Sequence, residues 1–386
     1  MKLFVLLPRV PFPLDKGDKL RAYHQLKQLA ANFQLKVVAL DDSGMNEKDL
    51  EHLHKEFDIE IVKLSRAVIY LRLIRALFSD KPFQVHYFFQ HAVNRKIQSI
   101  IGDFQPEHIY CQLIRTAEYV KNIHSVPKTI DYMDAFSRGM ERRIRGSRLI
   151  KKYFIRKEAS RLLKYENLIF DYFENRTIIS EQDRSLIYHP DRNDISVVPN
   201  GVDFDYFHPS EREKKFDIVF TGNMSYPPNV DGAVFLVNEI IPIVRSRFPE
   251  VKLLVAGANP SKQVMNLSSD TISISGWIDD IREAYGGASV FIAPMRIGTG
   301  LQNKLLEAMA MQMPCVTTAF ANKALGAEDR RSVLIGNTKE ELANALIELL
   351  SDYESASQIA LQGSDFIKNK YSWEFSTRSL IDIIKQ

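Results

Sequence analysis

Short apolar runs alternate with helical patterns along the whole chain, and this alternation restricts the fold more than any other feature. A repeated order of strand, helix and strand is typical of an α/β protein with parallel sheets. The expected strands form two series, which are Leu3–Leu7, Leu35–Leu40, Ile59–Val62, His108–Cys111, Thr129–Tyr132 and Thr177–Ile179, and then Asp217–Thr221, Lys252–Ala256, Ile272–Ser275, Val290–Ala293, Cys315–Thr318 and Val333–Ile335. The pattern therefore predicts two doubly wound α/β domains.

A turn-rich segment, Val198–Pro209, and the charged run Ser210–Lys215 separate the two series. The 386 residues also exceed the roughly 250–300 at which one hydrophobic core stops growing. We expect an N-terminal domain over 1–205, a C-terminal domain over 206–370, and a last helix in 371–386 that packs back on the first domain. Ligands of doubly wound domains bind at the carboxyl ends of the strands, which predicts a cleft between the domains.

Composition excludes several classes of protein. The net charge is only +3, and no apolar run reaches the roughly 18 residues of a membrane span. The two cysteines, Cys111 and Cys315, lie in apolar strand-like runs, as expected of buried free thiols in a reducing compartment. The run Leu3–Leu7 is too short for a signal peptide. These features predict a cytoplasmic protein.

The segment after Ala293 carries the densest group of candidate binding residues. Gly298 and Gly300 let the backbone approach a ligand closely, and helical spacing of leucines begins directly behind them. Amides at the start of a helix form an anion site, and Arg296 and Lys304 add two cations. Glu307 follows on the same helix. A phosphate-bearing ligand with hydroxyl groups fits this layout; an ordinary loop-to-helix turn with solvated charges is the alternative.

Several motifs together carry a resemblance to a known family. They are Ile178–Glu181, Val198–Asp203, Phe220–Gly222, Leu254–Gly257, Gly276–Asp280, Lys304–Ala310 and Tyr371–Trp373. In these motifs the chain resembles retaining glycosyltransferases of family 4 with the GT-B fold, and in particular the bacterial sugar transferases of exopolysaccharide clusters. The resemblance implies two Rossmann-like domains facing across a cleft. The C-terminal domain would bind a nucleotide-sugar donor, and the N-terminal domain would bind a glycan or lipid-linked acceptor.

The resemblance also implies which residues bind the nucleotide-sugar. They are Gly17, Gly222, Asn223, Gly276, Trp277, Ile278, Gly298, Thr299, Gly300, Leu301, Asn303 and Glu307. Two glutamates eight positions apart are the family signature; Glu307 matches the second, on the ribose, whereas Thr299 replaces the first. The loop 222–229 lacks the basic residues of many members, so Arg296 and Lys304 are expected to hold the diphosphate.

Other assignments remain open at the level of sequence. Asp131 and Asp134 end a strand and either orient the acceptor hydroxyl or serve as capping and turn acids. The resemblance implies that backbone groups of Gly276–Ile278 read the edge of the base, and the alternative is that Trp277 is simply a core residue. No Asp-x-Asp cluster lies in a plausible position near Gly298, which predicts a metal-independent enzyme that needs no cofactor beyond its substrate. Front-side substitution, as usually described for this family, requires no protein nucleophile.

Two basic stretches, Arg66–Phe78 and Arg138–Lys164, bear on the acceptor. Cations mixed with apolar residues at helical spacing are typical of helices that lie on anionic membranes. A lipid-linked acceptor at the inner membrane would explain them, and solvated helix faces over a normal core are the alternative. Nucleic-acid binding is not expected, because no aromatic platform or known module accompanies the charges.

Two other functions on the same fold compete with glycosyl transfer in bacterial surface polysaccharide biosynthesis. The departure at Thr299 favours a non-catalytic nucleotide or glycan binder. A nucleotide-sugar epimerase or a phosphorylase would require a catalytic acid/base set or a lysine that carries pyridoxal phosphate, and the sequence offers neither.

Overall fold

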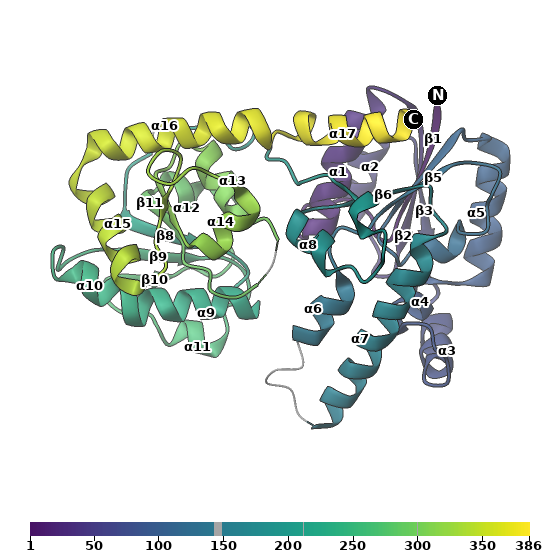
Figure 1. The fold of residues 1–386 in the computed structure, drawn as a ribbon, viewed down its shortest axis with the longest axis horizontal. Helices are drawn as coiled ribbons and strands as arrows, with labels where there is room; N and C mark the ends of the chain where they lie inside the picture. Colours follow the sequence, from purple (N-terminus) through teal and green to yellow (C-terminus); the bar gives the residue numbers. More distant parts are fainter. Residues whose placement is uncertain (143–148, 211, 299) are drawn as a thin grey trace. The chain divides into compact units, whose positions relative to one another are not determined.

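The computed structural model describes residues 1–386 except 143–148, 211 and 299, and it describes no side chains within 142–151. The chain divides into two compact units (Figure 1). Unit 1 comprises Met1–Pro199 and Ser376–Gln386, and unit 2 comprises Asn200–Phe375. The divisions thus lie at 199/200 and 375/376, several residues from the expected boundaries at 205 and 370.

Unit 1 contains a seven-stranded parallel sheet in the order β3-β2-β1-β4-β5-β6-β7. The strands are β1 (Lys2–Leu7), β2 (Gln34–Asp41), β3 (Ile59–Lys63), β4 (His108–Gln112), β5 (Lys128–Asp131), β6 (Asn175–Ile178) and β7 (Ser196–Val197). The first six follow the classic order of a doubly wound sheet. β7 was not predicted, because two residues are too few to give a periodic pattern; it pairs with β6 through Thr177 and Ser196.

Helices cover both faces of this sheet. They are α1 (Gly17–Ala30), α2 (Glu47–Glu56), α3 (Arg66–Ala76), α4 (Phe83–Phe88), α5 (His91–Phe104), α6 (Phe136–Arg142), α7 (Leu149–Phe170) and α8 (Glu181–Leu186), with short 3₁₀ turns at Ala117–Tyr119 and Arg192–Asp194. β1 shows why two cores form. Its side chains alternate between the faces, so that Phe4 and Leu6 enter one core and Leu3, Val5 and Leu7 enter the other.

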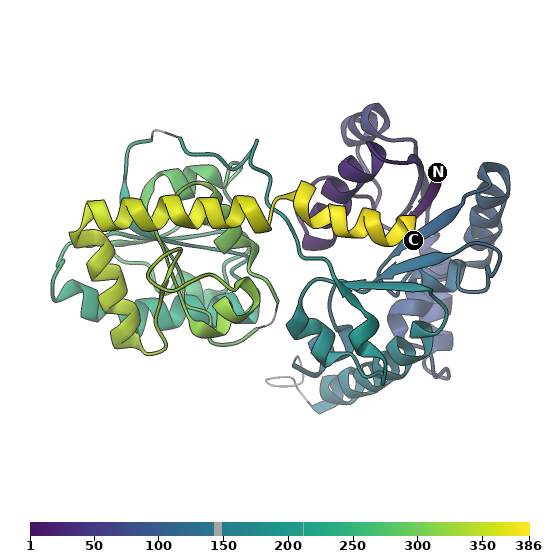
Figure 2. The ribbon, with the colours of Figure 1, turned by 45° about the horizontal axis from the view of Figure 1, so that its top comes forward.

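The helix α17 (Trp373–Lys385) runs from unit 2 into unit 1 (Figure 2). Leu380, Ile381 and Ile384 belong to the same core as Leu3 and the α1 residue Leu26. Asn175, on β6, donates from Nδ2 to the carbonyl oxygen of Ile383 at 3.2 Å. The residues 376–386 therefore form part of the hydrophobic core of unit 1.

Unit 2 contains a six-stranded parallel sheet in the equivalent order, β10-β9-β8-β11-β12-β13. Its strands are β8 (Phe216–Thr221), β9 (Leu253–Ala256), β10 (Ile272–Ile274), β11 (Ala288–Ala293), β12 (Cys315–Thr317) and β13 (Leu334–Ile335). Its helices are α9 (Pro227–Phe235), a π-helical segment (Leu236–Ile240), α10 (Ile241–Arg245), α11 (Lys262–Met265), α12 (Arg282–Gly286), α13 (Asn303–Ala310), α14 (Ala319–Leu325), α15 (Lys339–Ser351) and α16 (Tyr353–Lys370).

The predicted fold class is confirmed in both units, and every strand expected from the sequence is present. Both cysteines are free and buried, as predicted: Cys111 lies on β4 and Cys315 on β12.

Candidate functional site

Glycine-containing loops meet at the carboxyl edge of the unit 2 sheet. Gly222 follows β8, Gly257 follows β9 and Gly276 follows β10. The Gly222 amide donates to the Ala256 carbonyl at 2.9 Å, and the Gly257 amide donates to the Gly276 carbonyl at 3.0 Å. The three loops are therefore joined by backbone hydrogen bonds into one rim, where ligands of doubly wound sheets bind.

Two of these glycines are required by close packing. A Cβ on Gly257 would lie 1.8 Å from the carbonyl oxygen of Gly222, and the residue has a φ of +140°. A Cβ on Gly222, with φ +154°, would lie 2.6 Å from Nδ2 of Asn229. Since L side chains avoid such angles and would collide here, only glycine lets the two loops approach.

The helix α13 presents Glu307 to this rim while burying Leu305, Leu306, Ala308 and Met309. Glu307 is partly buried, and its Oε2 accepts a 2.7 Å hydrogen bond from Tyr285. Burial raises the pKa of Glu307, whereas the Tyr285 hydrogen bond and Lys304 oppose that shift. Among the described residues, the other oxygen, Oε1, has no hydrogen-bond partner and remains available to a ligand.

Tyr285 fixes the direction of that carboxylate. It is fully buried, and its hydroxyl lies 3.0 Å from Thr221 Oγ1 as well as contacting Glu307. Burial, followed by the nearby Glu307, raises the pKa of Tyr285 well above its usual value, so the phenol keeps its proton and donates. Tyr285 was not predicted as a site residue, because nothing in the 282–286 segment indicates a contact with Glu307, 22 residues later.

Lys304 lies one turn before Glu307 in an unusual environment for a cation. Its Nζ donates to Oδ1 of Asn229 and lies 5.0 Å from the centre of the Phe220 ring. Asn229 in turn donates from Nδ2 to the Asn223 carbonyl at 3.0 Å. Burial lowers the pKa of Lys304 to about 7, with Glu307 opposing the shift. The charge of Lys304 is therefore easily lost near neutral pH.

Arg296 is held differently. It is 42% exposed at its side chain and donates to Asp231 through Nε at 3.1 Å and Nη2 at 2.9 Å. Its guanidinium also lies 4.0 Å from the centre of the Phe235 ring and 3.8 Å from Glu239. Because two carboxylates already match its charge, Lys304 is the stronger candidate for an anion ligand.

The remaining residues expected at the donor site follow β11 and β10. Gly298 and Gly300 have positive φ angles, +120° and +75°. Leu301 is buried, and the Asn303 side chain accepts from Asn200 Nδ2 at 3.2 Å. The side chain of Gln302, the N-cap residue of α13, does not cap the helix, so among the described residues that side chain leaves the first amides to a ligand or solvent. Thr299 lies outside the described residues.

Trp277 is 65% exposed, so the interpretation of this side chain as core is wrong. Its Nε1 donates to Asp279 at 2.9 Å, which holds the indole at the surface beside Gly276, whose φ is +69°. Ile278, by contrast, packs against the unit 2 core. Asn223 is exposed, and its side chain is held by the Ser225 amide at 3.0 Å.

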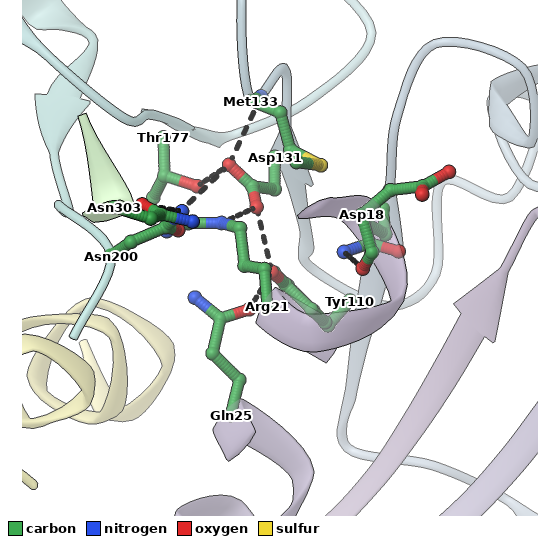
Figure 3. A network of polar contacts seen from close by, with 10 residues as sticks. Asp18, Arg21, Gln25, Tyr110, Asp131, Met133, Thr177, Asn200 and Asn303 are labelled. Carbon is green, nitrogen blue, oxygen red and sulfur yellow. Dashed lines mark hydrogen bonds and ion pairs between the residues drawn. The ribbon is translucent and has the colours of Figure 1, made fainter. Parts of the chain in front are cut away.

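In unit 1, Asp131 lies in a closed network of polar contacts (Figure 3). The carboxylate is fully buried and accepts from Arg21 Nε at 2.7 Å, Tyr110 at 3.1 Å and Thr177 at 3.0 Å. Arg21 is fully buried as well. The prediction that Asp131 contacts an acceptor is therefore wrong. Its oxygens accept hydrogen bonds from residues of unit 1, and the side chain is not accessible to solvent.

Asp134 differs, since it is exposed three residues after the strand. The left-handed Met133, with φ +60°, turns the chain between the two acids. Near Asp134 the pKa of Glu166 is raised to about 7, mainly by burial and in part by Asp134. Of the two acids, only Asp134 is accessible to a substrate.

The same carboxyl edge of the unit 1 sheet holds a cavity of about 550 Å³. It is polar, and its lining includes Arg9, Phe12, Lys19, Asp42 and Tyr87. Tyr87 donates to Asp42 at 2.7 Å, and Lys19 pairs with Asp15 at 2.8 Å. Gly17 begins α1 close by in sequence, and a Cβ there would meet no atom within 4 Å.

Within the described ranges, no three His, Cys, Asp or Glu residues are grouped to hold a metal ion. Over the same residues, the structure has no helix with the length and apolar character needed to cross a bilayer.

Residues 215–352 match the family model described as glycosyl transferases group 1. The matched segment runs from β8 to the end of α15 and therefore lies within unit 2. The curated relative "Uncharacterized 44.6 kDa protein in cps region" from Klebsiella pneumoniae is 23% identical over 398 residues, with 96% of each chain covered.

Solved structures agree on the fold. The chain is similar to the sucrose-phosphate synthase of Thermosynechococcus elongatus, with a TM-score of 0.72, 14% identity, and coverage of 100% of this chain and 99% of that one. Anabaena HepE in complex with UDP gives a TM-score of 0.69 at 11% identity, with both chains fully covered. The two parallel-sheet units are therefore those of the GT-B fold.

Proposed function

We propose that the protein is a retaining glycosyltransferase that moves a sugar from a nucleotide-sugar to a glycan or lipid-linked acceptor in bacterial surface polysaccharide biosynthesis. The observation that carries the proposal is the Tyr285–Glu307 pair beside Lys304, at the carboxyl edge of a group 1 domain. The structures similar to this chain include complexes of Anabaena HepE with UDP-glucose and of S. aureus TarM with UDP, and the Klebsiella relative lies in a cps region.

Different residues would hold the ribose, the diphosphate, the base and the sugar of the donor. Glu307 would accept hydrogen bonds from the ribose hydroxyl groups through Oε1, while Oε2 accepts the hydrogen bond of Tyr285. Lys304 would supply a positive charge to the diphosphate, and the first amides of α13, which the Gln302 side chain does not cap, would donate hydrogen bonds to it. The loop Gly276–Ile278 lies beside the base, with the exposed indole of Trp277 available to stack. Gly298 and Gly300 leave room for the sugar.

The reaction would need no metal, since Lys304 and oriented amides stabilise the charge that develops on the leaving phosphate. The acceptor hydroxyl oxygen bonds to the anomeric carbon on the face from which the diphosphate departs, so the configuration is retained. The hydroxyl proton passes to the departing phosphate oxygen. The polar cavity of unit 1 would bind the acceptor. Asp134 does not line that cavity, but it is exposed, whereas Asp131 is buried.

Glu307→Ala is expected to weaken nucleotide binding by about 10–100-fold, the worth of a hydrogen bond to a charged group. The test is a thermal-shift panel of UDP, GDP, ADP, dTDP and their sugar conjugates, followed by calorimetry on the best ligand. Tyr285→Phe should give a smaller loss, because it frees the carboxylate without removing it. Glu340→Ala, which removes an exposed acid of α15, is the matched control and should bind normally.

Unchanged nucleotide affinity in Glu307→Ala would refute the site assignment. Tight nucleotide binding without transfer to any polysaccharide-derived acceptor would favour the non-catalytic binder. Conversion of the donor to its epimer would instead favour an epimerase.

The affinity for the nucleoside diphosphate is expected to fall as the pH rises from about 7 to 9. The free protein loses the Lys304 proton near pH 7, whereas a bound diphosphate favours the charged form, so binding takes up a proton. Calorimetry at pH 8 in buffers of different ionisation enthalpy should detect this uptake. Lys304→Met should abolish it and Arg296→Met should not; equal uptake in Lys304→Met would contradict the assignment.

The same shift affects stability without ligand. The pKa of Lys304 is lower in the folded state than the ordinary value of 10.5, so between about 7 and 10.5 the unfolded chain binds more protons. The contribution of Lys304 to the free energy of unfolding should therefore rise with pH across that window and be constant below it.

A further inference from the structure

One helix of unit 1 leaves a row of large apolar side chains exposed. Along α3 and the turn that follows it, Tyr70, Leu71, Ile74 and Phe78 are 69%, 61%, 58% and 90% exposed, and Leu77 is exposed as well. We call these five residues the α3 outer face. Isolated exposed apolar residues are ordinary, but a contiguous group of this size marks an interaction surface.

Helical spacing places the outer face on one side of α3. Tyr70, Ile74 and Phe78 are four residues apart, and Leu71 adjoins them. The opposite side already packs inward, with Ile69 and Ala76 buried in the unit 1 core. Since the core contacts of α3 are complete without it, the outer face does not serve the folding of unit 1.

The helix α7 is hydrogen-bonded to the end of α3, and both helices belong to unit 1 (Figure 1). Arg161 donates to the Ala76 carbonyl at 2.8 Å, and Lys157 donates to the Leu77 carbonyl at 3.1 Å. α7 itself exposes Tyr153 and Phe154. The apolar residues of both helices thus sit on connected, fixed backbone rather than on a loose segment.

Positive charges predominate around the outer face, although the exposed acid Asp80 lies two residues after Phe78. Residues 66–79 contain three arginines and no acid. Arg66 and Arg75 are exposed, and Arg156 is exposed on α7, whereas Arg72 turns inward to the His86 carbonyl. Aromatic and aliphatic side chains flanked by arginines match the interface of an anionic bilayer, in which rings and methyl groups enter the acyl boundary and cations meet phosphates.

We propose that the α3 outer face, with Tyr153 and Phe154, docks the protein on an anionic lipid surface. The described part of the chain has no spanning helix, so the contact is peripheral. Docking would bring unit 1 to a lipid-linked acceptor if the proposed function holds, yet it is measurable without any glycosyl transfer.

The test is co-sedimentation of the full chain with phosphatidylcholine vesicles that contain or lack phosphatidylglycerol. The protein should sediment with the anionic vesicles, and high salt should release part of it. Ile74→Ser with Phe78→Ser should reduce binding by about tenfold or more, because both side chains are lost from the apolar contact. Arg66→Gln with Arg75→Gln should weaken binding to anionic vesicles only.

Tyr353→Ser is the matched control, since Tyr353 is 87% exposed on α16 of unit 2 and should leave binding unchanged. A thermal melt establishes that each variant is folded. As an independent measurement, Phe78→Trp should show fluorescence quenching by brominated acyl chains beyond that of the unsubstituted protein.

The proposal is overturned if the protein does not bind anionic vesicles, binds neutral ones equally, or binds unchanged after Ile74 and Phe78 are replaced. Self-association through this face without vesicle binding would likewise reject it in favour of a protein partner.

Discussion

Asp131→Asn is expected to lower the free energy of unfolding by about 3–5 kcal/mol, the cost of leaving a buried charge without its partner. Arg21 and Asp131 are both fully buried, and the asparagine cannot balance the guanidinium that remains. Chemical and thermal unfolding of the full chain should show the loss. Asp134→Asn is the control, since Asp134 is exposed and should change stability by no more than about 0.5 kcal/mol.

A double variant separates a structural role from a catalytic one. Arg21→Met with Asp131→Leu removes both charges, so its cost should be smaller than the sum of the two single substitutions. If Asp131→Asn instead unfolded like the unsubstituted protein yet lost all transfer activity, the carboxylate would act on substrate and the structural interpretation would fail.

Gly257→Ala is expected to destabilise unit 2 by more than about 3 kcal/mol, because the new side chain would collide with backbone at a φ angle that L residues rarely adopt. The added methyl would lie 1.8 Å from the Gly222 carbonyl oxygen, so the β8 and β9 loops would have to separate. Since those loops form the rim of the candidate site, nucleotide binding should fall as well. Thermal melting and calorimetry measure the two effects.

Gly102→Ala is the matched control, because Gly102, on α5, has open space around it and no positive φ angle. It should lower the free energy of unfolding by no more than about 0.5 kcal/mol. A Gly257→Ala protein that melts and binds nucleotide normally would show that the two loops tolerate a wider spacing.

The fold was predictable because short local stretches of sequence are enough to indicate its strands. β1 and β11 are apolar runs bounded by turn residues, and each is buried on both faces. β7 was not predicted, because two residues show no periodicity. Their place in the sheet depends on pairing with β6. The division at Pro199 also depends on contacts that a local composition change does not encode.

The candidate site was predictable only in part. Glu307 and Lys304 share one helix, so spacing alone brings them together. Tyr285 comes from another helix, and no local pattern indicates that its hydroxyl reaches Glu307. Asp131 was misjudged for the same reason: an acid at a strand end has the same sequence context whether it faces a ligand or pairs with Arg21, 110 residues away.

The path of α17 has a consequence for the order in which the protein matures on the ribosome. Leu380, Ile381 and Ile384 complete the unit 1 core, yet they are synthesised after the whole of unit 2, which is one continuous stretch. Unit 2 can therefore fold completely on the nascent chain before unit 1 does. Until α17 is synthesised, the core of unit 1 that contains Leu26 and Leu29 is incomplete. This reverses the usual order, in which the N-terminal domain finishes first. A chain broken off after Phe375 would keep that apolar surface exposed, which makes truncated products candidates for chaperone capture and degradation.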